Sequence, residues 1–140
     1  MFLLRGLAVW LLIACAESVH GILRTMFLAP AVGDFRARQI SVVTGSILIL
    51  AIAFGCARWL RADTTRSRVA VGLMWLSLTL LFEFGLGRLV MGFSWERLLS
   101  DYDISRGGLL PFGLILLMLS PLVAARLRGI EKRRPQQRQA

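Results

Sequence analysis

Four long apolar blocks dominate this chain of 140 residues and limit the folds that it can adopt. A helix needs about 20 mostly apolar residues to cross a hydrocarbon core roughly 30 Å thick, and within lipid it satisfies its own backbone hydrogen bonds. The pattern therefore predicts an all-α fold, a four-helix transmembrane bundle with antiparallel neighbours, whose spans cover residues 3–23, 40–60, 69–91 and 109–127. We expect a single transmembrane domain over residues 1–128 and a basic cytoplasmic tail over residues 129–140.

The first block shares features with a secretory signal peptide, because Arg5 precedes an apolar stretch that contains the small residues Ala14, Cys15 and Ala16. The apolar pattern nevertheless continues as far as Phe27, as a membrane-spanning helix requires. We therefore expect this block to be retained as the first helix.

The charges of the chain, 17 basic and 8 acidic residues, would favour nucleic acid as the partner of a soluble protein. Here the arginines lie at the ends of apolar blocks, where they orient a membrane protein, so we expect the lipid bilayer as the partner and no nucleic acid. The link between the second and third blocks and the C-terminal tail are both rich in arginine. The positive-inside rule predicts that both ends of the chain are cytoplasmic, in the inner membrane of a bacterium.

The predicted first external loop, residues 29–39, departs from this rule, because Arg36 and Arg38 are accompanied only by Asp34. One explanation is that a short loop escapes the rule. The other is that these arginines fold back over the bundle to meet acidic groups or an anionic ligand.

Prolines and glycines indicate several helix ends. Pro30 and Gly33 are expected to end the first helix, and Pro111 to begin the fourth. Pro121 lies inside the fourth block, where it should kink the helix and free a backbone carbonyl that Ser120 can satisfy.

A weak internal repeat appears when the sequence is compared with itself at an offset of roughly 66 to 68 residues. Matched pairs include Glu17 with Glu83, Asp34 with Asp101, and Gly45 with Gly113. The repeat predicts two parallel-oriented helical hairpins related by an axis along the membrane normal. Chance matching of common residues is the alternative.

Charged residues inside two of the spans are the strongest candidates for function, since each costs several kcal/mol in lipid without a partner or water. Glu17, His20 and Arg24 lie along one face of the first helix. The third helix likewise carries an acidic and a basic residue within its span, Glu83 and Arg88. In the predicted topology both helices carry an acidic group at depth and a basic group nearer the outer surface.

The candidate substrate or ion site therefore combines these intramembrane charges with the external loops. Its members are Glu17, His20, Arg24, Arg36, Arg38, Glu83, Arg88, Asp101, Tyr102 and Asp103. One imidazole without diagnostic ligand spacing argues against a metal site, and no sequence motif indicates a cofactor or a catalytic residue. Whether the protein is an enzyme stays open.

Three functions are compatible with this pattern. The first is a transporter or channel-like protein, in which Glu17, His20 and Glu83 bind a proton or ion and the arginines attract an anion. The second is a protein or enzyme that binds an anionic lipid headgroup. The third is a non-catalytic subunit of a larger membrane complex, in which Glu17 and Glu83 pair with Arg24 and Arg88 only to lock the helices together. A homo-oligomer is compatible with the transporter and would argue against the subunit.

Overall fold

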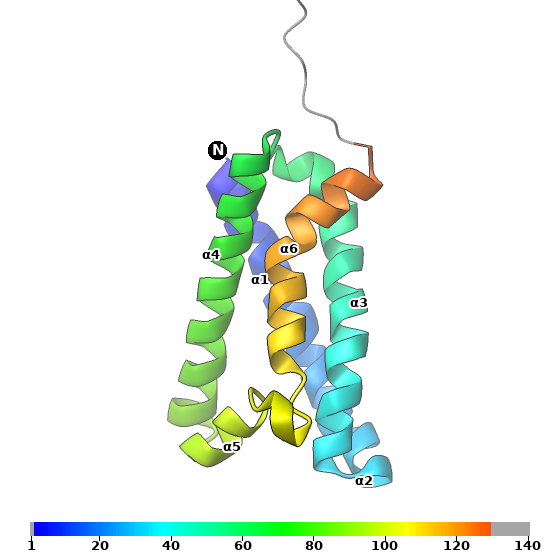
Figure 1. The fold of residues 1–140 in the computed structure, drawn as a ribbon, viewed down its shortest axis with the longest axis vertical. Helices are drawn as coiled ribbons and strands as arrows, with labels where there is room; N and C mark the ends of the chain where they lie inside the picture. The colour runs from blue at the N-terminus through cyan, green and yellow to red at the C-terminus, as the bar shows by residue number, and fades with distance from the viewer. Residues whose placement is uncertain (1, 130–140) are drawn as a thin grey trace, which may run out of the picture.

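The computed structural model describes residues 2–129 as a long bundle of helices (Figure 1). Four of its helical stretches are long and apolar enough to cross a membrane, and no strand occurs between residues 2 and 129. The predicted all-α four-helix bundle is confirmed. In chain order the elements are α1 (Phe2–Leu23), η1 (Arg24–Leu28), α2 (Ala29–Val32), α3 (Asp34–Leu60), α4 (Thr65–Gly85), η2 (Leu86–Val90), α5 (Trp95–Ser100), η3 (Ile104–Arg106) and α6 (Leu110–Leu127).

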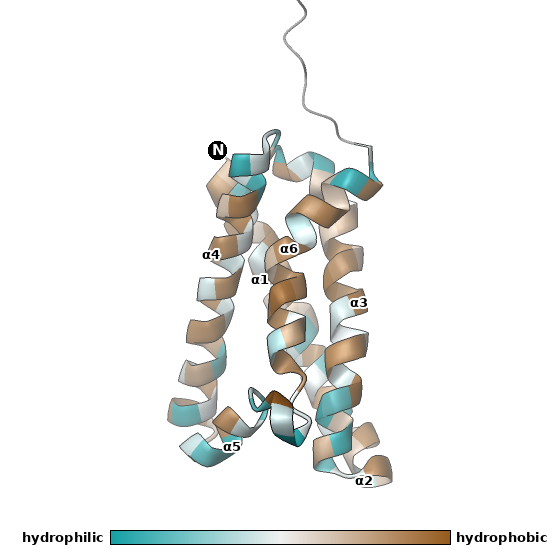
Figure 2. Ribbon diagram, in the orientation of Figure 1, coloured by the Kyte–Doolittle hydropathy of each residue, from teal (hydrophilic) through white to brown (hydrophobic). Residues whose placement is uncertain are grey.

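The outer surface of the bundle is apolar over most of its length. Figure 2 shows hydrophobic residues along the middle of the helices and hydrophilic residues gathered at both ends. Large side chains such as Leu81 and Leu89 are 72% and 86% exposed. A soluble monomer rarely exposes so large a continuous apolar surface, whereas lipid covers it without cost.

Consecutive long helices run antiparallel, so α1 and α3 form one hairpin and α4 and α6 form a second (Figure 1). The two hairpins pack side by side, with α3 against α6 and α1 against α4. A two-fold axis along the bundle would instead place α1 diagonally opposite α4. The contacts between the hairpins therefore differ from those that such an axis gives. Gly113 lets α6 approach α3 closely, since a Cβ there would lie 3.2 Å from Val42.

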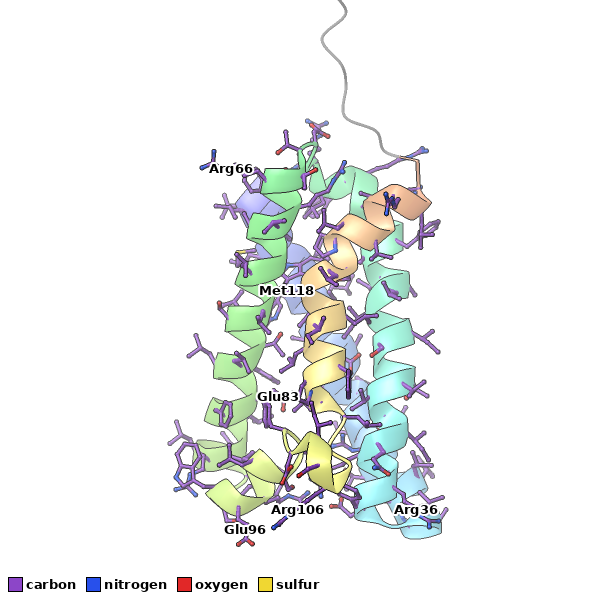
Figure 3. The ribbon with its side chains drawn as sticks, viewed as in Figure 1. Arg36, Arg66, Glu83, Glu96, Arg106 and Met118 are labelled. Atoms are coloured by element: carbon purple, nitrogen blue, oxygen red, sulfur yellow. The ribbon has the colours of Figure 1, made fainter. Side chains whose placement is uncertain are left out.

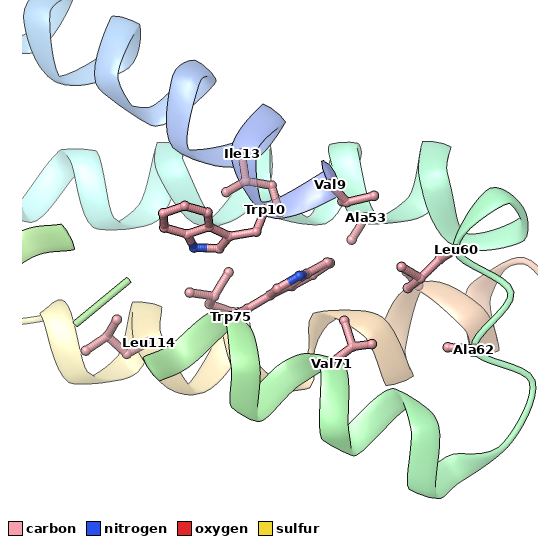
Figure 4. Packing of buried hydrophobic residues seen from close by; sticks show 11 residues of the cluster. Val9, Trp10, Ile13, Ala53, Leu60, Ala62, Val71, Trp75 and Leu114 are labelled. Carbon is pink, nitrogen blue, oxygen red and sulfur yellow. The ribbon is translucent and has the colours of Figure 1, made fainter. Parts of the chain in front are cut away.

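The buried core draws on all four long helices, and its tryptophans join α1 to α4 (Figure 4). Trp75 is fully buried and donates a hydrogen bond of 2.8 Å from its indole nitrogen to the carbonyl of Gly6. The indole nitrogen of Trp10 donates to the Thr79 hydroxyl at 3.0 Å. These two bonds satisfy the only polar atom of each buried indole and fix α1 on α4.

Residues 29–39 do not form the predicted loop. Helix continues through η1 and α2 to Val32, and α3 begins at Asp34, after a break at Gly33 alone, whose φ is 90°. Glycine adopts this left-handed backbone without steric cost, so one residue makes the turn. Pro30 does not end the helix: it lies in the first turn of α2, directly after the π-helical turn η1.

The predicted role of Pro121 and Ser120 is confirmed. Pro121 lies inside α6 and cannot donate to the carbonyl of Leu117, and the Ser120 hydroxyl donates to that carbonyl instead, at 2.7 Å. The C-terminal part of α6 bends toward α3 (Figure 1). The basic tail predicted over residues 129–140 lies outside the described residues, apart from Gly129.

Candidate functional site

The face of α1 that packs on α4 continues beyond the tryptophan core as a row of charged side chains. Trp10, Glu17 and Arg24 lie seven residues apart, two helical turns each, and therefore share one face. On α4, Glu83 lies one turn beyond Thr79, which accepts the hydrogen bond of Trp10. Glu17, His20, Arg24 and Glu83 thus lie within about two helical turns of one another along the bundle, in the half nearer α5, and we call them the charged layer.

Glu17 and His20 form one side of the charged layer. The Nδ1 atom of His20 lies 3.4 Å from the Oε2 atom of Glu17, and its Nε2 atom lies 2.8 Å from the Thr44 hydroxyl on α3. The Glu17 carboxylate packs over Gly45, where a Cβ would lie 2.9 Å from Oε2. The other carboxylate oxygen, Oε1, is buried and has no hydrogen-bond partner within residues 2–129.

Glu83 and Arg24 form the other side of the charged layer. Figure 3 shows Glu83 on the side of α4 that faces α6 and the interior of the bundle. The Glu83 carboxylate lies within electrostatic range of Arg24, Asp101 and Glu17. Among the residues that the structure describes, neither Glu83 nor Arg24 has a direct hydrogen bond or ion pair, and Glu83 is exposed. No ion pair joins Glu17 or Glu83 to Arg24 or Arg88 within residues 2–129: Glu17 and Arg24 are two turns apart, and Glu83 and Arg88, five residues apart, lie on different helix faces.

A network of ion pairs covers the charged layer at the α5 end of the bundle, and we call it the arginine lock. Arg38 contacts Asp101 at 2.6 Å and Asp34 at 3.2 Å, and Asp34 also contacts Arg97 at 3.1 Å. The Gln39 side chain donates to the carbonyl of Gly107 at 2.7 Å. The hypothesis that an arginine of this segment folds back to meet acidic groups is confirmed for Arg38.

The arginine lock should hold α3 to the segment between α5 and α6. The Arg38 side chain is only 14% exposed, so replacing it with glutamine leaves Asp101 without its strongest partner. We expect Arg38→Gln to lower the free energy of unfolding by roughly 2 kcal/mol, the range for charged hydrogen bonds. Arg36→Gln is the control, because Arg36 is exposed and has no partner in the described part of the chain. Equal stability of the two variants in a detergent unfolding titration would contradict this role.

Tyr102 lies between the arginine lock and the charged layer. Its ring stacks on Phe84 with 5.6 Å between centroids, and its hydroxyl is buried without a hydrogen-bond partner among the described residues. Burial, with smaller effects from the negative charges of Glu83 and Asp101, raises the pKa of the Tyr102 hydroxyl to about 12. Tyr102 therefore offers a neutral hydrogen-bond donor next to the charged layer.

The pKa of Tyr102 can be measured without interference, because the chain has 1 tyrosine. We expect tyrosinate absorbance to appear with a midpoint near 12 in the folded protein and near 10 in the unfolded chain. Because folding raises this pKa, the stabilisation is complete below pH about 10 and is lost as the pH rises toward about 12. A midpoint near 10 in protein that retains its helical circular dichroism would contradict the burial of Tyr102.

The remaining predicted site residues lie apart from the charged layer. Arg36 is exposed at the end of the bundle. Asp103 accepts a hydrogen bond from the Ser105 hydroxyl, which with the Arg106 charge lowers the pKa of this carboxyl and makes it a helix cap. Arg88 donates to the carbonyl of Phe93 at 2.8 Å, away from Glu83.

Four residues that contribute to this region were not among the predicted site residues. They are Asp34, Thr44, Gly45 and Arg97. Asp34 and Arg38 lie four positions apart, so their ion pair could have been predicted if this segment had been interpreted as a helix. Nothing local marks Thr44 or Gly45, because their roles depend on the packing of α1 on α3.

The fold and the charged layer define an integral membrane protein of four helices with a polar level in one half of its bundle. Comparison of the sequence with family models, with curated proteins and with solved structures found no match. Residues 2–129 contain no group of three or more His, Cys, Asp or Glu side chains that could hold a metal ion.

Proposed function

We propose that this protein is a small membrane transporter or channel-like protein whose charged layer binds a proton or another small cation. The observation that supports it is the incomplete pairing of the charged layer. Glu17 and Glu83 share one guanidinium, that of Arg24, and neither makes an ion pair with it. Pairs that only lock helices together are expected to contact each other directly, as those of the arginine lock do.

The charges of this region favour a cation over an anion. The arginine lock is balanced, since Asp34 and Asp101 neutralise Arg38 and Arg97. The charged layer then holds two carboxylates against Arg24, which leaves one negative charge while His20 is neutral. A net charge inside a membrane is costly, so uptake of one proton or monovalent cation is favourable.

The contacts of His20 provide two places for a proton. If the Thr44 hydroxyl donates to the backbone carbonyl of Ile40, which lies 3.2 Å away, it accepts from Nε2 of His20. Nδ1 and the Glu17 carboxylate then face each other and need a shared proton. If the hydroxyl rotates to donate to Nε2, the neutral ring donates from Nδ1 to Glu17 and no extra proton is needed. Rotation of one hydroxyl thus accompanies proton uptake and release at Glu17 and His20.

The proposed orientation places the charged layer toward the outside of a bacterial inner membrane, with both ends of the chain in the cytoplasm. The arginine-rich turn between α3 and α4 supports it, since Arg58, Arg61 and Arg66 gather at the opposite end of the bundle from α5. Cations would then reach Glu83 from the external side, beneath the arginine lock.

Flux measurements on the whole protein in proteoliposomes test this function. Vesicles with a pH-sensitive dye inside receive a potassium diffusion potential, and the rate of proton entry is compared with that of protein-free vesicles. We expect faster proton entry in the presence of the protein. Parallel sodium and potassium measurements identify another cation if the rate for protons is unchanged. No protein-dependent flux of any of the three would contradict the proposal.

A further inference from the structure

A second feature of the molecule lies on the lipid-facing side of α4, outside the charged layer. An open groove of about 560 Å³ runs along this side from Leu80 to Leu89 and ends at Arg88 and Trp95. Gly85 is one of its lining residues, and a Cβ at Gly85 would meet no atom within 4 Å. The groove is therefore open at Gly85 because glycine has no side chain. Apart from Arg88, the residues that line it are apolar or aromatic.

Arg88 is fixed at the end of this groove. Its guanidinium lies over the Trp95 ring, 4.8 Å from the centroid, and donates to the carbonyl of Phe93. No acidic residue pairs with it among residues 2–129, and Glu96, the acidic residue next to Trp95, points away from the bundle (Figure 3). The other N–H donors of Arg88 remain available, with a positive charge held at the level where lipid headgroups lie.

We infer that this groove binds an anionic glycerophospholipid, with an acyl chain along α4 over Gly85 and the phosphate at Arg88. An apolar trough that leads to one unopposed guanidinium matches the two parts of such a lipid. Arginine recognises phosphate through paired N–H donors, and a basic side chain near the headgroups contributes about 1 kcal/mol to binding of anionic lipid. This site is separate from the proposed cation site, because neither Glu83 nor any other member of the charged layer is among the residues that line the groove.

Native mass spectrometry of the whole purified protein, with phosphatidylglycerol and phosphatidylcholine supplied in equal amounts, tests this inference. We expect the wild-type protein to retain phosphatidylglycerol with a preference of about 5-fold, the equivalent of 1 kcal/mol. Arg88→Gln should abolish the preference, and Arg88→Lys, which keeps the charge, should retain part of it. Gly85→Leu, which fills the groove without a clash, should reduce the binding of both lipids.

Arg36→Gln is the matched control, since it removes an exposed arginine at the same end of the bundle and should leave the preference unchanged. Helical circular dichroism establishes that each variant is folded. An Arg88→Gln protein that keeps the wild-type preference would overturn the assignment of the phosphate to Arg88. Unchanged lipid retention in Gly85→Leu would overturn the assignment of the acyl chain to the groove. Neither result depends on cation flux.

Discussion

Replacing Gly72 with alanine is expected to lower the free energy of unfolding by about 3 kcal/mol, the upper part of the range for overpacking. A Cβ at Gly72 would lie 2.0 Å from the carbonyl oxygen of Met118 and 3.0 Å from its carbonyl carbon. These are backbone atoms of α6, so no side-chain rotation relieves the clash and the two helices must separate. The separation would weaken the packing of α4 on α6 and of Trp75 in the core.

Gly55→Ala is the matched control for Gly72→Ala. Gly55 lies in α3, and a Cβ there would meet no atom within 4 Å. Alanine is the better helix former by roughly 1 kcal/mol, so Gly55→Ala should be neutral or slightly stabilising. Unfolding in detergent, followed by circular dichroism, measures both variants. Comparable stability of Gly72→Ala and Gly55→Ala would show that α4 and α6 do not approach as described.

Neutralising either carboxylate of the charged layer should abolish most of the cation flux. Glu17→Gln and Glu83→Gln each remove one negative charge, which leaves Arg24 balanced by a single carboxylate and removes the reason for the layer to take up a cation. We expect the rate of proton entry into proteoliposomes to fall about 100-fold in each variant, the lower end of the range for loss of a proton-transfer group. Stability should change less, because neither carboxylate makes an ion pair with Arg24.

Two comparisons make this result specific to the charged layer. Arg36→Gln should carry wild-type flux, because Arg36 lies at the surface, outside the layer. Arg38→Gln should lower stability and retain a measurable flux, because Arg38 belongs to the arginine lock. Folded Glu17→Gln and Glu83→Gln proteins with wild-type flux would exclude a role for the two carboxylates in transport.

The helices were predictable from the sequence because lipid sets a length that four apolar blocks satisfy. The start of α3 was not predictable, since a polar segment that contains Asp34, Arg36 and Arg38 is typical of a loop. In the structure Gly33 makes the turn alone, and Arg38 and Asp34 pair with Asp101 and Arg97, which are distant in sequence. Helix ends that depend on tertiary ion pairs leave no local signal.

The candidate site was predicted in part. The spacing of Glu17, His20 and Arg24 predicted that they share one helix face, and in the structure Glu83 lies within electrostatic range of Glu17 and Arg24. The partners of the arginines were not predictable, because whether Arg38 meets Asp101 or an anion depends on how the segment after α5 folds back. Arg88 was grouped with Glu83 by proximity in sequence, although a separation of five residues turns it toward the lipid-facing groove.

The most direct test of the charged layer is whether water reaches residue 83 from the side of α5. Cysteine is introduced as Glu83→Cys in a chain whose Cys15 and Cys56 are replaced with alanine, and a membrane-impermeant thiol reagent is added outside. Leu81→Cys is the control, since Leu81 is 72% exposed but faces the lipid. Only a thiolate in water reacts rapidly. We predict modification of Glu83→Cys and none of Leu81→Cys; equal protection of both would contradict an open, cation-binding layer.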